Sequence, residues 1–247
     1  MPYSDFVPNI YEIPGAELMA DKRVIVAIDG PAGVGKSTLA KRVADKLGFV
    51  YINTGAMYRA VALWALRLGV ATSDMHRLEQ LAKGASIELL PGEENRVLLN
   101  GEDVTAAIRE LKVSQAASQI SVVPAVRRAL LQVQRDAAKR NSVVMEGRDI
   151  GTVVFPEAQV KIFLDADPIE RAKRRALEMH GHDGEVESIA KELHKRDQRD
   201  RTRSEAPLMQ APDAQLVDTT GLSLDEVEEI VLRLVRGRVS NGKAAAG

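Results

Sequence analysis

A glycine-rich phosphate-binding motif stands directly between an apolar segment and a helical segment, and it constrains the fold more than any other feature of the sequence. The motif reads Gly30-Pro31-Ala32-Gly33-Val34-Gly35-Lys36-Ser37 and matches the P-loop pattern G-x-x-x-x-G-K-S in full. The apolar run of residues 24–28 precedes it, and Leu39, Val43 and Leu47 follow with the spacing of one helix face. A strand, a phosphate-binding loop and a helix in this order predict an α/β fold with a nucleotide site at the end of the first strand.

The residue types of this motif suit phosphate chemistry. Glycines allow the backbone N–H groups to point at a phosphate, and the helix N-terminus adds partial positive charge. Lys36 is expected to reach the β- and γ-phosphates of ATP, and the Ser37 hydroxyl is expected to bind Mg²⁺. A plain glycine-rich turn is the alternative, but such a turn need not follow a strand and open a helix. The Asn-Lys-x-Asp string of GTPases and the Ser-Gly-Gly signature of transporter ATPases are both absent from the sequence.

Short apolar runs alternate with helical segments along most of the chain. Such runs are continuous rather than alternating, which is typical of parallel strands buried on both faces of a sheet. We therefore expect an α/β fold whose five-stranded parallel sheet carries helices on both faces. The expected strands are residues 24–28, 49–52, 142–145, 160–164 and 216–218.

One segment, residues 69–124, interrupts this alternation. The turn signals Pro91-Gly92 and Asn100-Gly101 bracket two short apolar runs, residues 86–90 and 95–99, which predicts a small antiparallel sheet. We interpret the segment as an insert that covers or shapes a ligand site. Residues 1–22 and 237–247 show no persistent period, so we expect disordered tails on either side of a domain spanning residues 23–236.

The composition excludes several classes of protein. The 34 Lys and Arg residues nearly balance the 35 Asp and Glu residues, which does not favour nucleic-acid binding. The chain has no cysteine, so disulfides and thiolate metal sites are excluded. No apolar stretch approaches the ~20 residues of a membrane span. We expect a cytoplasmic, monomeric enzyme whose partners are small molecules, with neither nucleic acid nor a membrane among them.

Basic residues gather at positions where a phosphorylated ligand could meet the P-loop. Arg196, Arg199, Asp200 and Arg203 would share one face of a helix, although a solvated charged face with local ion pairs would show the same pattern. Residues 147–149 (Gly-Arg-Asp) follow the third expected strand, and residues 54–59 follow the second. Ligands of open parallel sheets bind at the carboxyl ends of strands. The pattern predicts phosphoryl transfer between two phosphorylated ligands above the sheet.

Several longer motifs make the chain resemble the bacterial cytidylate kinase family, within the nucleoside monophosphate kinases. The resemblance covers residues 24–235, including the insert, and implies a P-loop kinase fold with a nucleotide-binding insert and a lid over residues 167–200. The motifs are Asp29-Gly-Pro-Ala-Gly-Val-Gly-Lys-Ser-Thr38, Thr54-Gly-Ala-Met-Tyr-Arg59, Glu146-Gly-Arg-Asp-Ile-Gly-Thr-Val-Val-Phe-Pro156, Lys161-Ile-Phe-Leu-Asp-Ala166 and Arg196-Asp-Gln-Arg-Asp-Arg-Thr-Arg203.

The resemblance implies transfer of the γ-phosphate of ATP to CMP or dCMP, with Mg²⁺ as cofactor bound through Ser37. It assigns catalysis to Lys36, Arg148, Arg196 and Arg203, and the ATP site to Gly30, Pro31, Ala32, Gly33, Val34, Gly35, Lys36, Ser37 and Thr38, with Arg171 and Arg175 in the lid. It assigns the CMP site to Thr54, Arg59, Ser118, Arg127, Arg148, Asp149, Arg196, Asp200 and Arg203. In the family, groups such as Ser118 and Arg127 read the cytosine edge, the two aspartates face the sugar hydroxyls, and the arginines bind the acceptor phosphate.

Two positions depart from the commonest pattern of that family. Asn53 and Glu146 each stand where aspartate is usual, and both bear on how the magnesium would be surrounded. Two other functions remain open from the residues: a kinase for another small anion, such as UMP, AMP or a shikimate-like metabolite, and a non-catalytic ATP sensor.

Overall fold

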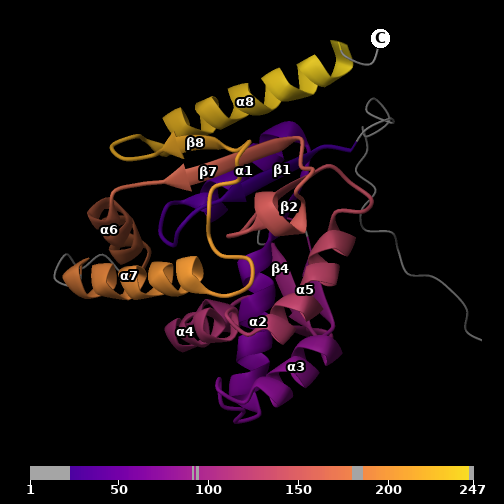
Figure 1. Cartoon of the computed structure of the whole chain (residues 1–247), viewed down its shortest axis with the longest axis vertical. Coiled ribbons are helices and arrows are strands. Elements are labelled where there is room, and N and C mark those ends of the chain that lie inside the picture. Colours follow the sequence, from indigo (N-terminus) through magenta and orange to yellow (C-terminus); the bar gives the residue numbers. More distant parts are fainter. Residues whose placement is uncertain (1–22, 91, 93–94, 180–185, 245–247) are drawn as a thin grey trace, which may run out of the picture.

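A five-stranded parallel sheet, in the order β2-β6-β1-β7-β8, forms the centre of the protein (Figure 1). The structure is a computed structural model that describes residues 23–90, 92, 95–179 and 186–244. The sheet and its parallel pairing confirm the prediction from the apolar runs. Its strands are β1 (Ile25–Asp29), β2 (Val50–Asn53), β6 (Val143–Glu146), β7 (Val160–Asp165) and β8 (Gln215–Asp218).

Both faces of the sheet are covered, which explains why its strands are continuously apolar. On β1, Ala27 belongs to one buried cluster, whereas Val26 and Ile28 belong to the cluster on the opposite face, as the two-residue period of a strand requires. Helices α1 (Lys36–Leu47) and α8 (Leu224–Ala244) bury their apolar residues on the side of Val26 and Ile28. The side of Ala27 is covered by α2 (Thr54–Arg67), α4 (Leu111–Ile120) and α5 (Pro124–Ala137).

The carboxyl ends of three neighbouring strands lie in register at one edge of the sheet. Glu146, the last residue of β6, pairs with Ile28 of β1 and with Asn53 of β2. Because these strands are parallel, the P-loop, the start of α2 and the loop that begins at Gly147 all leave the sheet on the same side. The fold therefore brings together three segments that are far apart in the sequence.

A separate antiparallel sheet, in the order β3-β4-β5, lies within residues 69–124 and confirms the predicted one. Asn100 and Gly101 connect β4 to β5 with φ angles of 52° and 82°, the positive values that a tight two-residue hairpin turn needs. Strand β5 was not predicted because two polar residues carry no strand pattern. The elements are α3 (Met75–Gly84), β3 (Ile87–Leu90), β4 (Arg96–Leu99), β5 (Glu102–Asp103) and the 3₁₀ turn η2 (Ala107–Arg109).

Two helices pack against each other beside the P-loop, at the left of Figure 1. They are α6 (Pro168–Met179) and α7 (Val186–Thr202), and they include the described part of residues 167–200. The role of this segment as a lid stays a prediction. One turn of π-helix, η3 (Ile150–Val154), follows the loop after β6.

The C-terminal end differs from the expectation of a tail beginning at residue 237. Helix α8 continues to Ala244, and the partly buried Val239 packs against the same cluster as the earlier turns of the helix. Gly237 weakens a helix by only ~1 kcal/mol relative to alanine, so apolar packing of the next turn can carry the helix past it. The expected tails at residues 1–22 and 245–247 lie outside the described residues. Among the described helices, none is long and apolar enough to cross a membrane.

Gly30 offers a test of how tightly the P-loop is seated on the sheet. It has a φ of 148°, and a Cβ at this position would lie 2.2 Å from the backbone oxygen of Leu164 in β7. Gly48, with a φ of 65°, has open space around the same position. We expect Gly48→Ala to lower the free energy of unfolding by ~1 kcal/mol, the cost of a strained φ alone, and Gly30→Ala to lower it by several times as much. Urea denaturation measures both; equal losses would contradict this account.

Candidate active site

The P-loop wraps round the N-terminus of α1 in the conformation that its glycines allow. Gly33 and Gly35 have φ angles of 76° and 91°, which side chains rarely tolerate. Lys36 is buried, and its Nζ donates to the backbone oxygen of Pro31 at 2.5 Å. The loop residues that line the neighbouring pocket are Ala32, Gly33, Gly35, Lys36, Ser37 and Thr38. Gly30, Pro31 and Val34 lie outside the lining and contribute to the loop as part of its backbone.

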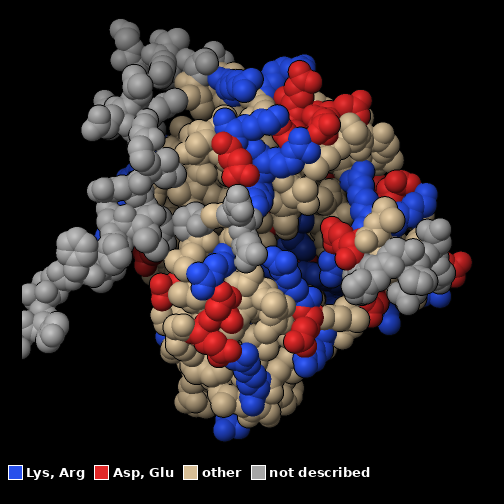
Figure 2. All heavy atoms as spheres, turned by 180° about the vertical axis from the view of Figure 1, so that it is seen from behind, with Lys and Arg blue, Asp and Glu red and all other residues tan. Residues whose placement is uncertain are grey.

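A pocket of about 1070 Å³ extends from the P-loop to the insert. Figure 2 shows Lys and Arg side chains around a hollow in this face of the molecule. Basic side chains outnumber acidic ones two to one in the lining: the basic ones are Lys36, Lys41, Arg42, Arg59, Arg109, Arg127, Arg148, Arg175, Arg196 and Arg203, and the acidic ones are Glu110, Glu146, Asp149, Glu178 and Asp200. Such a lining favours polyanionic ligands although the whole chain is nearly neutral.

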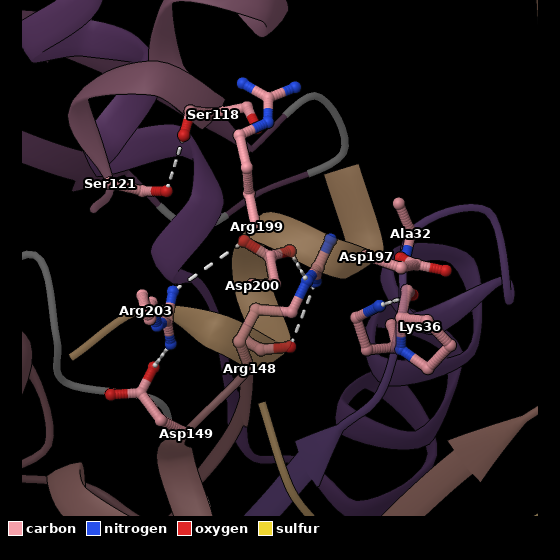
Figure 3. A network of polar contacts seen from close by, with 12 residues as sticks. Ala32, Lys36, Ser118, Ser121, Arg148, Asp149, Asp197, Arg199, Asp200 and Arg203 are labelled. Carbon is pink, nitrogen blue, oxygen red and sulfur yellow. Dashed lines mark hydrogen bonds and ion pairs between the residues drawn. The ribbon is translucent and has the colours of Figure 1, made fainter. Parts of the chain in front are cut away.

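Two aspartates hold three of the arginines in place at one end of the pocket; Figure 3 shows Asp149 beside Arg203 and Asp200 beside Arg148. Asp149 accepts from Arg127 Nη2 at 2.5 Å and from Arg203 Nη2 at 3.2 Å. Asp200 accepts from Arg148 Nε at 3.0 Å. These contacts join α5, the loop after β6, α7 and the residue after α7, so they confirm that residues far apart in the sequence form one cluster. Arg199 lies outside the pocket lining, and its Nε donates to the backbone oxygen of Lys195 at 3.4 Å.

Three buried polar atoms of the predicted site have no partner within the described part of the protein. They are Arg59 Nε, Ser118 Oγ and Arg196 Nε. An unpaired buried donor costs about 1–3 kcal/mol, and all three side chains line the pocket. These atoms are therefore suited to contacts with a bound ligand.

The lowered pKa values of the buried basic groups show the electrostatic cost of this arrangement. Burial, together with the charge of Arg148, lowers the pKa of Lys36 well below its usual range and that of Arg196 to about 10. Burial also lowers the pKa of Arg59, although Glu146 opposes this shift. A bound phosphate would relieve this strain because it supplies the missing negative charge.

The two positions that depart from the family pattern take part in one hydrogen-bonded group. Tyr51 donates its hydroxyl to Glu146 Oε1 at 2.6 Å and accepts from Asn53 Nδ2 at 3.1 Å. Asn53 also caps α2 by accepting from the backbone nitrogen of Ala56 at 3.0 Å, a role in which asparagine equals aspartate. The Ser37 hydroxyl interacts with the same Tyr51 hydroxyl. Oxygen groups of Ser37 and Glu146 thus lie together beside the P-loop, which fits the preference of Mg²⁺ for oxygen ligands.

Arg171, which the resemblance assigns to the lid over ATP, has its contacts with the P-loop backbone and with α7. It lies outside the pocket lining and is buried, with Nη1 donating to the backbone oxygen of Ala32 at 3.1 Å and to Asp197 Oδ2 at 2.5 Å. Asp197 in turn accepts from the backbone nitrogen of Ala32 at 3.3 Å. Arg171 therefore connects α6 and α7 to the P-loop, whereas Arg175 lines the pocket. The sequence places both arginines on one helix but does not reveal which of them has a buried partner.

Two further residues of the site were not singled out from the sequence. The Tyr58 ring lies beneath Arg127, whose guanidinium carbon is 5.7 Å from the ring centre, a cation–π distance. Asp29 is buried behind the pocket and accepts backbone hydrogen bonds from Ile150 and Gly151. An acidic residue ending a buried apolar strand was the available signal for Asp29, since such a carboxylate needs partners.

Comparisons with known proteins agree with this geometry. A family model described as cytidylate kinase matches residues 26–237. A cytidylate kinase of Solibacter usitatus (strain Ellin6076) is 60% identical over 91% of this chain and 99% of its own length. A cytidylate kinase of Symbiobacterium thermophilum is 47% identical over 87% of this chain and 97% of its own length. A cytidylate kinase of Geobacter sp. (strain M21) is 46% identical over 91% of this chain and 98% of its own length.

The buried contact between Arg171 and Asp197 predicts a contrast between two arginines of α6. Arg171→Ala should lower the free energy of unfolding by ~3 kcal/mol or more, because it leaves a buried carboxylate without its partner. Arg175 pairs with the exposed Glu178, so Arg175→Ala should change stability by less than ~1 kcal/mol. Urea denaturation of both variants gives the comparison. A stability loss for Arg171→Ala as small as that for Arg175→Ala would contradict the assignment.

Proposed function

The chain belongs to the cytidylate kinase family, and we propose that it transfers the γ-phosphate of ATP to CMP or dCMP, giving ADP and CDP or dCDP. The single observation that carries this proposal is the shared pocket, in which a P-loop faces a buried arginine cluster. One end suits a nucleoside triphosphate and the other suits a second phosphorylated ligand. Action as a monomer in the cytoplasm is part of the same proposal.

The donor half of the site is the P-loop. In this proposal residues 30–38 bind the ATP phosphates, Lys36 contacts the β- and γ-phosphates, and Arg175 approaches ATP from α6. The side chains of Ser37 and Glu146 would hold Mg²⁺ with the phosphates of the nucleotide. When bound, the ion neutralises phosphate charge that the side chains alone leave uncompensated.

The acceptor half is the cluster round Asp149 and Asp200. Arg59, Arg148, Arg196 and Arg203 would bind the acceptor phosphate, and the unpaired atoms of Arg59 and Arg196 support this role. Ser118 and Arg127 are proposed to contact the hydrogen-bonding edge of cytosine. Thr54, Asp149 and Asp200 would position the sugar and the loop that follows β6. Although burial alone would raise it, the charges of Arg148 and Arg196 keep the pKa of Asp200 below its usual value, so Asp200 can accept hydrogen bonds at neutral pH.

The chemistry requires alignment and charge neutralisation more than proton transfer. The attacking oxygen belongs to a phosphate that is already anionic, so no strong general base is needed. The side chains bring two polyanions together in line and stabilise the charge that spreads over the transferred phosphoryl group. Losing one such charge-assisted contact commonly costs ~3 kcal/mol, or a factor of about a hundred or more in rate.

The two alternative functions make different demands on the site. A kinase for another small anion would use the same P-loop, but the unpaired Ser118 hydroxyl and the Arg127 guanidinium beside Tyr58 favour a planar base with hydrogen-bonding edges. A non-catalytic ATP sensor would not need a second buried arginine cluster opposite the P-loop. We therefore retain phosphoryl transfer to a nucleoside monophosphate, and the family match favours CMP or dCMP over UMP and AMP.

A panel of acceptors tests the proposal directly. ADP release from ATP and Mg²⁺ is followed with CMP, dCMP, UMP, AMP and shikimate in turn. We expect rapid release with CMP or dCMP and at least tenfold lower kcat/KM with the others, since a site built to pair a base edge rejects ligands that leave its polar groups unpaired. No ADP release with any acceptor would favour the sensor, and preference for another acceptor would assign a different kinase.

Lys36→Ala serves as the control for that assay. Removal of the buried ammonium should reduce CMP-dependent ADP release by at least about a hundredfold. The circular dichroism spectrum should stay unchanged, which separates loss of chemistry from loss of fold. Near-normal turnover by this variant would contradict the proposed site.

A further inference from the structure

The loop after β6 carries two residues of the acceptor site, and it is anchored to β1 on both sides of them. Before them, Gly147 N donates to the backbone oxygen of Ile28 at 3.0 Å. After them, the backbone nitrogens of Ile150 and Gly151 donate to Asp29 Oδ1 and Oδ2, each at 2.8 Å. Arg148 and Asp149 are the residues between these anchors. Their backbone position therefore depends on a strand that otherwise leads into the P-loop.

Asp29 is placed where donor and acceptor halves of the site meet. It ends β1 and directly precedes Gly30, the first glycine of the P-loop. Its side chain is buried and lies outside the pocket lining. Asp29 can therefore affect the loop after β6 without touching either nucleotide.

The carboxylate suits this task better than a neutral side chain. Each of its oxygens accepts from a different backbone N–H, and charged acceptors make stronger bonds than neutral ones. Burial raises the pKa of Asp29 to about 6, with the two backbone bonds opposing the shift, so the group is mainly ionised at neutral pH. The isolated burial of a charge is costly, and these contacts offset part of that cost.

The anchored loop has little room to move. A Cβ on Gly147 would lie 2.6 Å from Ile150 Cδ1 and 2.8 Å from Thr54 Oγ1. The same loop is held from α2, because Thr54 Oγ1 donates to the backbone oxygen of Glu146 at 2.7 Å. Close packing transmits a small shift of the anchor to the side chains that the loop carries.

We propose that Asp29 is a positioning residue for phosphoryl transfer: it fixes the acceptor loop of Arg148 and Asp149 relative to the P-loop. This inference rests on the proposed function, and it adds a residue that makes no contact with substrate. Because misplacement of a reacting group by ~1 Å can cost a hundredfold in rate, loss of this anchor should reduce the use of the acceptor. The ATP site, formed mainly by the P-loop backbone, should be less affected.

Asp29→Asn tests the proposal with little change in size. The amide keeps one accepting oxygen, but its NH₂ group would face a second backbone N–H. We expect kcat/KM for CMP to fall between about ten- and a hundredfold, whereas the KM for ATP should stay within about twofold. A general loss of stability would instead change both substrates alike.

Glu228→Gln is a matched control. Glu228 is also a buried carboxylate, and it is held by Arg42 and Lys46 between α1 and α8. Like Asp29→Asn, this variant replaces a buried carboxylate by an amide, but it leaves the loop after β6 intact. The kcat/KM for CMP should not change, and a fall equal to that of Asp29→Asn would overturn the proposal.

Amide hydrogen exchange gives a readout that is independent of activity. In the full-length wild-type chain without nucleotide, the amides of Ile150 and Gly151 should exchange slowly, and in Asp29→Asn at least one should exchange at least tenfold faster. Fast exchange of both amides in the wild type would overturn the proposal even if the variant does not fold. Unchanged use of CMP by a folded Asp29→Asn would also overturn it, whereas absence of CMP-dependent ADP release from the wild type would instead contradict the proposed function.

Discussion

The excess of buried positive charge in one pocket is the constraint on which the rest of the site depends. Lys36, Arg59 and Arg196 are held at lowered pKa values by burial and by their neighbours. Among the described residues, Asp149 and Asp200 are the acidic partners of Arg127, Arg148 and Arg203, and they orient these arginines without neutralising the whole pocket. Folding therefore buries like charges at an electrostatic cost, and bound phosphate groups can offset that cost. For this reason a nearly neutral chain can bind two polyanions in one pocket.

Side chains that hydrogen-bond to the backbone hold the loops of the pocket in a defined geometry. Arg171 and Asp197 bracket the backbone of Ala32, which connects the P-loop to α6 and α7. Asp29 connects β1 to the loop that follows β6. None of these three side chains lines the pocket. Alignment of the two halves thus depends on residues that a list of pocket contacts would omit.

Much of the fold was predictable because it follows from local patterns. Continuous apolar strands predicted the parallel sheet, and the runs at residues 86–90 and 95–99 with their turn signals predicted the small antiparallel sheet of the insert, without its third strand. The partners of charged residues were not predictable, because Arg171 and Arg175 have the same chemistry and differ only in what packs against them. The same holds for Asp149, whose two arginine partners come from other segments of the chain. The first two residues of η3, the π-helical turn after β6, donate to Asp29, which lies more than a hundred residues earlier in the sequence, and no local pattern reports such a contact.

The central claim is that both phosphates meet in the one pocket and that the phosphoryl group passes directly between them. The most direct test is the stereochemical course at the transferred phosphorus, measured with ATP made chiral at the γ-position and CMP as acceptor. A single in-line displacement predicts inversion of configuration. Retention would require a phosphorylated intermediate of the protein and would contradict the account.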